Sequence, residues 1–165
     1  MNDLPPPDSH YLNAAAGWCE LGNCAEARAE FKRISAVHRD HPAVLETEWQ
    51  VCAAERDWLS ALEAARRHIE TAPQNPSGWI HQSYSLHEMK LTREAWNQLL
   101  AVADRFPGVS TIAYNLACYA CQLGDREEAR QWLKRAIKSR SEEEIKRLAL
   151  SDPDLRPMWE DIRKL

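Results

Sequence analysis

The chain has 165 residues, of which 44% are apolar and 28% are charged, and its formal net charge at pH 7 is -4. This composition is typical of an ordinary soluble globular protein and argues against intrinsic disorder. No window approaches the ~18 apolar residues that a membrane span needs, so we expect no membrane partner. The acidic balance argues against a surface that follows nucleic-acid phosphates, so we expect no nucleic-acid partner either.

Residues 1–8 are expected to form an extended leader, because Pro5, Pro6 and Pro7 cannot propagate a helix. The segment also lacks the basic and apolar parts of a secretory signal peptide, so we expect a cytoplasmic protein. The five cysteines are an odd number in a chain without a secretion signal, and they fit free thiols better than a disulfide framework.

The sequence after the leader carries an internal period of 34 residues. Four alanines follow one another at this step: Ala27, Ala61, Ala95 and Ala129. Within each period the apolar residues recur at helical spacing in two segments. A small side chain lets two helices approach to about 8 Å, so we expect each alanine at the contact between paired helices.

Start signals delimit the expected helices. Pro42 and Pro76 suit the first turn of a helix, where the missing N–H would have no helical partner. Asp57 and Asp125 stand where an N-cap is required. The expected helices are 9–21 and 24–37, 42–55 and 58–71, 76–89 and 92–105, and 110–123 and 126–139. They make up four units at about 9–41, 42–75, 76–109 and 110–140.

The best-preserved unit is the last one, in which residues 115–117 read Asn-Leu-Ala and Gly124 and Asp125 precede Ala129. A 34-residue helix–turn–helix unit with these positions resembles the tetratricopeptide repeat. The resemblance covers four repeats. It implies an all-α fold, in which the repeats form a right-handed superhelical array, or solenoid.

Two of the repeats depart from the pattern of that family. The first has Arg39 where a proline is usual. The second has Arg56 in place of the turn glycine and the bulky Trp49 where a small residue is usual. These departures concern the packing between the first two repeats.

Residues 141–165 are expected to cap the array. Ser141 and Glu144 form a capping box at the start of a short helix that runs toward Leu150. A turn at residues 152–154 follows, and this tail resembles the segment that closes some bacterial tetratricopeptide arrays. Three apolar residues at helical spacing should cover the apolar face of the last repeat: Leu155, Trp159 and Ile162.

The resemblance also implies a concave groove, lined by the first helix of each pair, that receives a peptide. The lining positions on which we expect the partner to bind are Glu46, Gln50, Ile80, His81, Tyr84, His87, Tyr114, Asn115 and Cys118. They combine hydrogen-bonding groups with apolar surface, a mixture that is common at protein interfaces. None is Lys or Arg, unlike the positions with which chaperone-docking members clamp a terminal carboxylate. We therefore expect the groove to bind internal or hydrophobic peptide segments.

The function that follows is that of a non-catalytic scaffold or adaptor, which binds a peptide segment of a partner protein. The alternative is a small chaperone for a secretion or assembly client. Only the C-terminal end of the array has an evident cap, so a homodimer through the N-terminal side is a further expectation.

Two patterns leave other chemistry open. Cys118 and Cys121 have the spacing of a redox motif, but they fall inside an expected helix, so we interpret them as packing or groove residues. A zinc site would need four ligands, and the other closely spaced pair of cysteines in the sequence lies three repeats away. The basic run from Arg126 to Arg140 is interpreted as a solvated helix face, with a patch for nucleic acid or an acidic partner as the alternative. No phosphate-binding, serine-hydrolase or metalloprotease motif is present, so we expect no enzyme, metal or cofactor.

Overall fold

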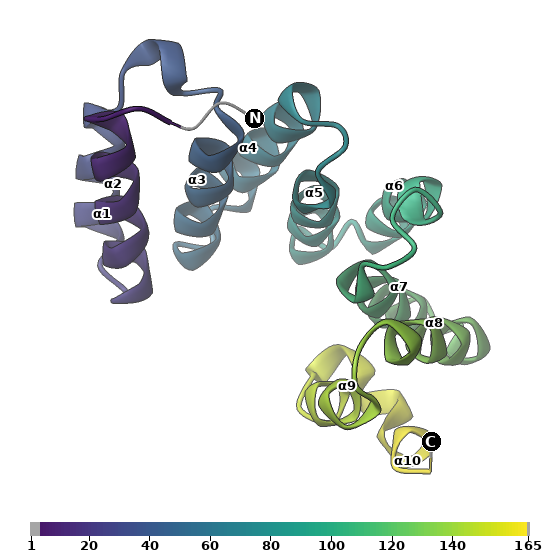
Figure 1. The fold of residues 1–165 in the computed structure, drawn as a ribbon. Coiled ribbons are helices and arrows are strands. Elements are labelled where there is room, and N and C mark those ends of the chain that lie inside the picture. The colour runs from purple at the N-terminus through teal and green to yellow at the C-terminus, as the bar shows by residue number, and fades with distance from the viewer. Residues whose placement is uncertain (1–3, 165) are drawn as a thin grey trace. The chain divides into compact units, whose positions relative to one another are not determined.

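The computed structural model describes residues 4–164, so the first three residues of the expected leader and the last residue of the chain lie outside the described part. Helices separated by short turns, without any strand, make up the described residues (Figure 1). The chain forms two compact units, unit 1 at residues 1–85 and unit 2 at residues 86–165.

Unit 1 contains two complete helix pairs, in which α1 packs on α2 and α3 packs on α4. The elements are α1 (Asp8–Glu20), α2 (Cys24–Arg33), the short 3-10 helix η1 (Ala36–His38), α3 (Pro42–Ala54), α4 (Trp58–Thr71) and most of α5 (Pro76–Glu88). The prolines expected in first turns, Pro42 and Pro76, do begin α3 and α5.

Unit 2 starts within α5 and contains α6 and the tightly packed pair of α7 and α8. The elements are α6 (Thr92–Ala103), α7 (Ser110–Gln122), α8 (Arg126–Ser139), α9 (Glu142–Ala149), the 3-10 helix η2 (Pro153–Met158) and α10 (Trp159–Ile162). The tail folds back, so that η2 lies against α7. Leu155 is 0% exposed and Ile162 is 1% exposed, whereas the Trp159 indole is only partly buried and donates to Ala149 O.

The alanines that define the period lie at the centre of the packing. Each of the four is 0% exposed: Ala27, Ala61, Ala95 and Ala129. Their burial confirms the prediction that a small side chain lies at the contact between helices. Larger apolar residues four positions further along are buried as well, such as Leu99 and Leu133, each 1% exposed.

The four turns between paired helices share one backbone conformation. Their central residues have positive φ angles of 75°, 58°, 66° and 88° and stand at the same 34-residue step: Gly22, Arg56, Lys90 and Gly124. In each turn the next residue donates its backbone N–H to a carbonyl five positions back, at 2.8 to 2.9 Å. This hydrogen bond closes the preceding helix in the manner of a left-handed C-terminal cap.

The residue after each of these positions directly precedes the second helix, at its N-cap. Asn23, Asp57 and Asp125 each accept a hydrogen bond from the backbone N–H three residues on, as an N-cap does. The predicted caps at Asp57 and Asp125 are therefore confirmed. Leu91 stands at the same position before α6 and has no side chain that could cap the helix.

The expected end of α2 is wrong, because the helix stops at Arg33 instead of residue 37. Ile34 is extended, with φ -64° and ψ 129°, and inserts into a buried apolar cluster with Leu12. The carboxylate of Asp8 holds the new direction, since it accepts a hydrogen bond from Ser35 N (3.2 Å) and pairs with His38. Asp8 is thus the first residue of α1 and not part of an extended leader.

The capping box expected at residue 141 is also wrong in its side-chain contacts. Helix α9 does begin directly after Ser141, but this side chain makes no cap hydrogen bond. Glu144, which should have reached back to the cap, instead pairs with Arg140 Nε at 2.8 Å.

Candidate functional site

An aromatic cluster lies between α3 and α5 in unit 1. The Trp49 indole stacks on the imidazole of His81, with ring centroids 3.8 Å apart and an interplanar angle of 1°. Trp49 Nε1–H donates a 2.9 Å hydrogen bond to Ser85 Oγ, which holds the indole between the two helices. The Tyr84 ring lies against the edge of Trp49, with centroids 6.0 Å apart, and against Trp58 of α4 at 5.8 Å.

Five of the expected groove residues lie in this part of unit 1. Gln50 stands one 34-residue step before Tyr84, and Glu46 stands one step before Ile80, so α3 and α5 present equivalent faces. Tyr84 is 37% exposed and Gln50 is exposed, whereas the other three are partly buried. We call these residues and their two supporting tryptophans the aromatic surface: Glu46, Gln50, Ile80, His81, Tyr84, Trp49 and Trp58.

The stacked imidazole of His81 is uncharged at neutral pH. Burial lowers the pKa of His81 to about 4, and the nearby His68 acts in the same direction. A neutral ring can lie flat on the Trp49 indole without the cost of desolvating a charge. The stack therefore forms a rigid base for the more exposed Tyr84.

The other four expected groove residues belong to unit 2, where the tail covers three of them. Tyr114 Oη donates a 2.8 Å hydrogen bond to Asp152 Oδ2, and Cys118 Sγ lies 3.5 Å from the same oxygen. His87 Nε2 pairs with Asp154 Oδ2 at 2.8 Å. His87 and Tyr114 are each 7% exposed and Cys118 is 4% exposed, so these side chains contact the tail instead of solvent.

The tail is fixed to this helix face by further hydrogen bonds. Gln122 Nε2 donates to the backbone carbonyl of Asp154 at 2.8 Å, and Asp154 N donates to Asp152 Oδ1 at 2.9 Å. The turn at residues 152–154 therefore occupies the face of α7 on which the sequence places a partner peptide. Asn115, the fourth expected residue, is partly buried on α7.

Comparisons with known proteins identify the architecture. No protein-family model matches the sequence, and no curated protein matches it. Among solved structures, one similar chain is TTC0263, a thermophilic tetratricopeptide-repeat protein of Thermus thermophilus, with 17% identity and a TM-score of 0.74. The alignment covers 96% of this chain and 100% of that one. The chain has the tetratricopeptide-repeat fold.

Two further solved structures are similar at low sequence identity. YrrB, described as having an unusual peptide-binding site, is 19% identical with a TM-score of 0.69, over 84% of this chain and 72% of that one. MamA MSR-1 is 17% identical with a TM-score of 0.65, over 95% of both chains.

The two cysteines with redox-motif spacing lie inside α7. Burial, reinforced by the Asp152 carboxylate, raises the pKa of Cys118 well above its usual value, and burial also raises the pKa of Cys121. A raised pKa favours the protonated thiol over the nucleophilic thiolate. Among residues 4–164, no group of three or more His, Cys, Asp or Glu side chains is arranged to hold a metal ion.

The basic run on α8 has contacts of its own. Arg130 pairs with Glu127 at 3.1 Å and lies 3.5 Å from Asp161, while Arg135 stacks over the Trp132 ring at 4.4 Å. Within the described part of the chain, no helix has the length and apolar character that a bilayer span requires.

The sequence does not indicate which residues support the aromatic surface or hold the tail on α7. The sequence marks Trp49 as a departure from the repeat pattern, and its indole carries the aromatic surface. Asp152 and Asp154 were interpreted as turn residues, although their carboxylates bind α5 and α7 side chains. Acidic residues on both sides of a proline, next to a capping segment, were the available signal.

Proposed function

We propose that the chain is a non-catalytic scaffold or adaptor, and that it binds a peptide segment of a partner protein on the aromatic surface of unit 1. The observation that carries this proposal is Tyr84, a large aromatic side chain that is 37% exposed while Trp49 and Trp58 hold it from behind. Rigid, partly exposed aromatic residues are enriched among the side chains that dominate binding energy at interfaces. The peptide-binding site that is named for YrrB supports the same class of function.

The chemistry of the surface fits a peptide with apolar and hydrogen-bonding groups. An apolar or aromatic side chain of the partner would pack on Tyr84 and Ile80, and its backbone amides would reach Gln50 and Glu46. Because the rings are already packed in the free protein, binding requires little ordering on the receptor side. The proposal leaves the α7 face, with His87, Tyr114, Asn115 and Cys118, to the chain's own tail.

The test starts from identification of the partner. Replacing Tyr84 by the photoreactive p-benzoylphenylalanine and irradiating cells of the native host should cross-link the partner segment, which mass spectrometry then identifies. Fluorescence anisotropy with that synthetic segment should show at least about tenfold weaker binding to Tyr84→Ala, equivalent to about 1.4 kcal/mol. Leu148→Ala in α9 is the control, because Leu148 is also exposed, at 45%.

Two results would change this proposal. Equal affinity of Tyr84→Ala and the unaltered protein would remove the aromatic surface as the binding site. Cross-links to many unrelated unfolded proteins, together with protection of several of them from aggregation, would favour the small chaperone for a secretion or assembly client.

We keep a cytoplasmic location as part of the proposal, since all five cysteines are free.

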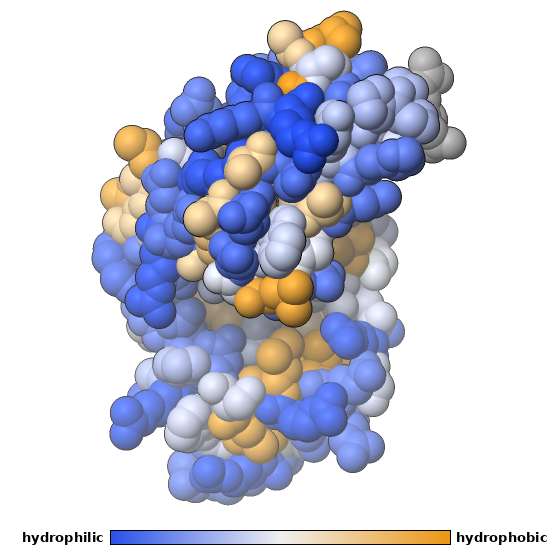
Figure 2. Space-filling view, turned by 90° about the vertical axis from the view of Figure 1, so that its left-hand side faces the viewer, coloured by the Kyte–Doolittle hydropathy of each residue, from blue (hydrophilic) through white to orange (hydrophobic). Residues whose placement is uncertain are grey.

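A homodimer through the N-terminal side is the remaining part of the proposal. Trp18 is 37% exposed and Leu21 is 77% exposed, both at the end of α1. Figure 2 shows mostly hydrophilic residues over the α1–α2 side, with apolar residues in small separate groups. Such a surface supports weak association at most. Light scattering across a concentration series should show a dimer that Leu21→Glu dissociates, and a monomer at all concentrations would contradict it.

A further inference from the structure

A pocket lies in unit 1, lined by residues of α2, of the connection to α3, of α3 itself and of α4. Its volume is about 390 Å³, and its lining includes four cationic side chains, one carboxylate and apolar surface. The residues that matter for its chemistry are Arg28, Phe31, Lys32, Arg39, Glu48 and Arg67. We call it the α2–α4 pocket.

Helix α2 ends early beside this pocket. It has 10 residues, whereas the corresponding helices α4, α6 and α8 have 14, 12 and 14. Ile34 leaves the helix in an extended conformation, and the chain then passes through η1 before α3 begins. The chain thus leaves the helix three residues after Phe31, which lines the pocket.

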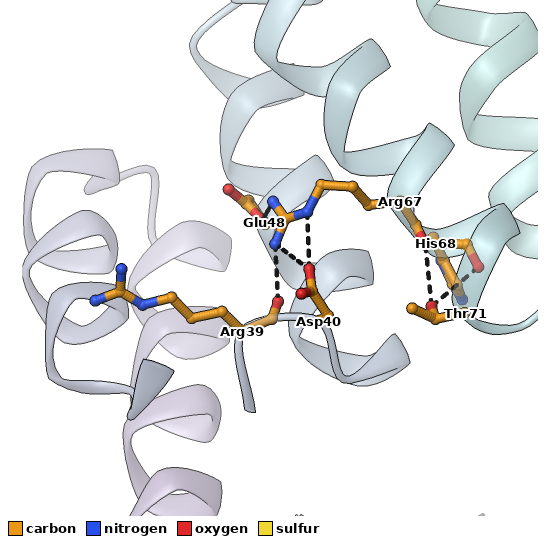
Figure 3. A network of polar contacts seen from close by, with 6 residues as sticks. All are labelled: Arg39, Asp40, Glu48, Arg67, His68 and Thr71. Atoms are coloured by element: carbon orange, nitrogen blue, oxygen red, sulfur yellow. Dashed lines mark hydrogen bonds and ion pairs between the residues drawn. The ribbon is translucent and has the colours of Figure 1, made fainter. Parts of the chain in front are cut away.

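Two of the four cations in the pocket already have carboxylate partners. Arg28 forms a bidentate ion pair with Glu55, in which Nε donates to Oε1 and Nη2 donates to Oε2. Arg67 pairs with Asp40 at 2.6 Å and with Glu48 at 3.3 Å (Figure 3). These pairs neutralise the inner part of the pocket.

The other two cations have no such partner. Among the described residues, the side chains of Lys32 and Arg39 take part in no ion pair. Only the backbone carbonyl of Arg39 joins the network, as the acceptor of a 3.2 Å hydrogen bond from Arg67. Figure 3 shows the Arg39 guanidinium pointing away from Arg67. Two exposed positive charges thus remain at the pocket for an incoming anion.

We propose that the α2–α4 pocket binds a peptide segment that carries carboxylates next to a bulky apolar side chain. The apolar side chain would contact Phe31 and the aliphatic parts of the surrounding Lys and Arg side chains. The carboxylates would pair with Lys32 and Arg39 at the rim, because Glu48 repels an acidic group deeper in the pocket. Its volume lies near the lower end of the range for ligand sites, which suits one or two side chains of a longer segment.

This pocket is separate from the aromatic surface. On α3 its lining residues Val44, Glu48 and Val51 recur at helical spacing. Glu46 and Gln50 of the aromatic surface are each two residues further along, a rotation of about 200° around the helix. The two sites therefore lie on different sides of α3, and substitutions can test them independently.

The experiment uses the whole chain and a fluorescein-labelled peptide in which one Phe is flanked by Asp and Glu. Fluorescence anisotropy should show binding that weakens as salt is added, because the charges involved are exposed. The double variant Lys32→Glu with Arg39→Glu should bind at least tenfold more weakly. The matched control is Arg66→Glu with Lys134→Glu, which changes the charge equally at exposed residues outside the pocket.

Further probes separate the contributions. Peptides with Asn and Gln in place of the acids, or with Ser in place of Phe, should each bind at least tenfold more weakly. The proposal is overturned by equal binding of the amide peptide, by equal losses in both double variants, or by no binding of the acidic peptide at about 1 mM. Tighter binding of decanoate, with displacement of the peptide, would overturn it in favour of a small amphipathic anion.

Discussion

Replacing Arg56 and Lys90 by glycine should stabilise the protein, although glycine removes side-chain contacts and makes the unfolded chain more flexible. Both residues hold positive φ angles, 58° and 66°, in turns where the first and last repeats use Gly22 and Gly124. Both side chains are exposed. The substitution therefore removes backbone strain without opening a cavity.

The magnitude follows from two opposing effects. A left-handed conformation costs a residue with a Cβ about 1–2 kcal/mol, and glycine relieves this strain. Glycine also adds about 0.4–1 kcal/mol of conformational entropy to the unfolded state. The net expectation is a gain of about 0.5–1 kcal/mol at each position. For a chain of this length the gain corresponds to a rise in Tm of about 1–4 °C per substitution.

Thermal unfolding followed by far-UV circular dichroism measures the effect in each single variant and in the pair. The two positions lie in separate turns, so the gains should add. Gly22→Ala and Gly124→Ala are the reverse controls. No atom lies within 4 Å of a Cβ built at either glycine, so their loss of stability reports conformation alone. A lower Tm for both Arg56→Gly and Lys90→Gly would refute the strain argument.

Three further predictions concern other positions. Leu91→Asp should add the missing N-cap of α6 and raise the free energy of unfolding by about 1 kcal/mol in urea titrations, whereas an unchanged value would show that α6 gains nothing from a cap. Because burial lowers the folded-state pKa of His81 to about 4 from a usual 6.5, the unfolded chain binds more protons between these values. Stability should therefore be complete above pH 6.5 and fall as the pH drops toward 4, and His81→Gln should flatten this dependence. The same pH dependence in His81→Gln would assign it to another group. Asp152→Ala leaves the buried Tyr114 hydroxyl without its 2.8 Å partner and should cost about 1–3 kcal/mol, with faster hydrogen exchange in the tail than in α3. Equal exchange in both segments would contradict a local role of Asp152.

The helices and the helix contacts could be predicted from the sequence because their determinants are local and repeat. Pro42 and Asp57 act within the turn that contains them, and each buried alanine is marked by the same 34-residue step. The left-handed turns at Arg56 and Lys90 keep this step although their residue types differ from glycine. Packing on both sides of each turn therefore outweighs the local preference of the turn residue.

The end of α2 could not be predicted in the same way, because its determinants are distant in the sequence. Asp8 reaches Ser35 across 27 residues, and nothing in the local pattern of residues 24–37 indicates this contact. The stack of Trp49 on His81 likewise depends on how α3 meets α5. A bulky residue at a position where a small one is usual indicates a change in packing. It does not indicate which ring the indole contacts.

The tail shows how a correct prediction of structure can redirect a prediction of function. The apolar residues after the turn at 152–154 were expected to cover the last repeat, and Leu155 and Ile162 are buried as expected. The same turn, however, brings two carboxylates onto His87, Tyr114 and Cys118, the side chains expected to receive a partner. A partner peptide on this face would have to replace several hydrogen bonds and expose Leu155, which is unfavourable. The aromatic surface of unit 1 needs no such displacement, and this difference is why our proposal places the partner there.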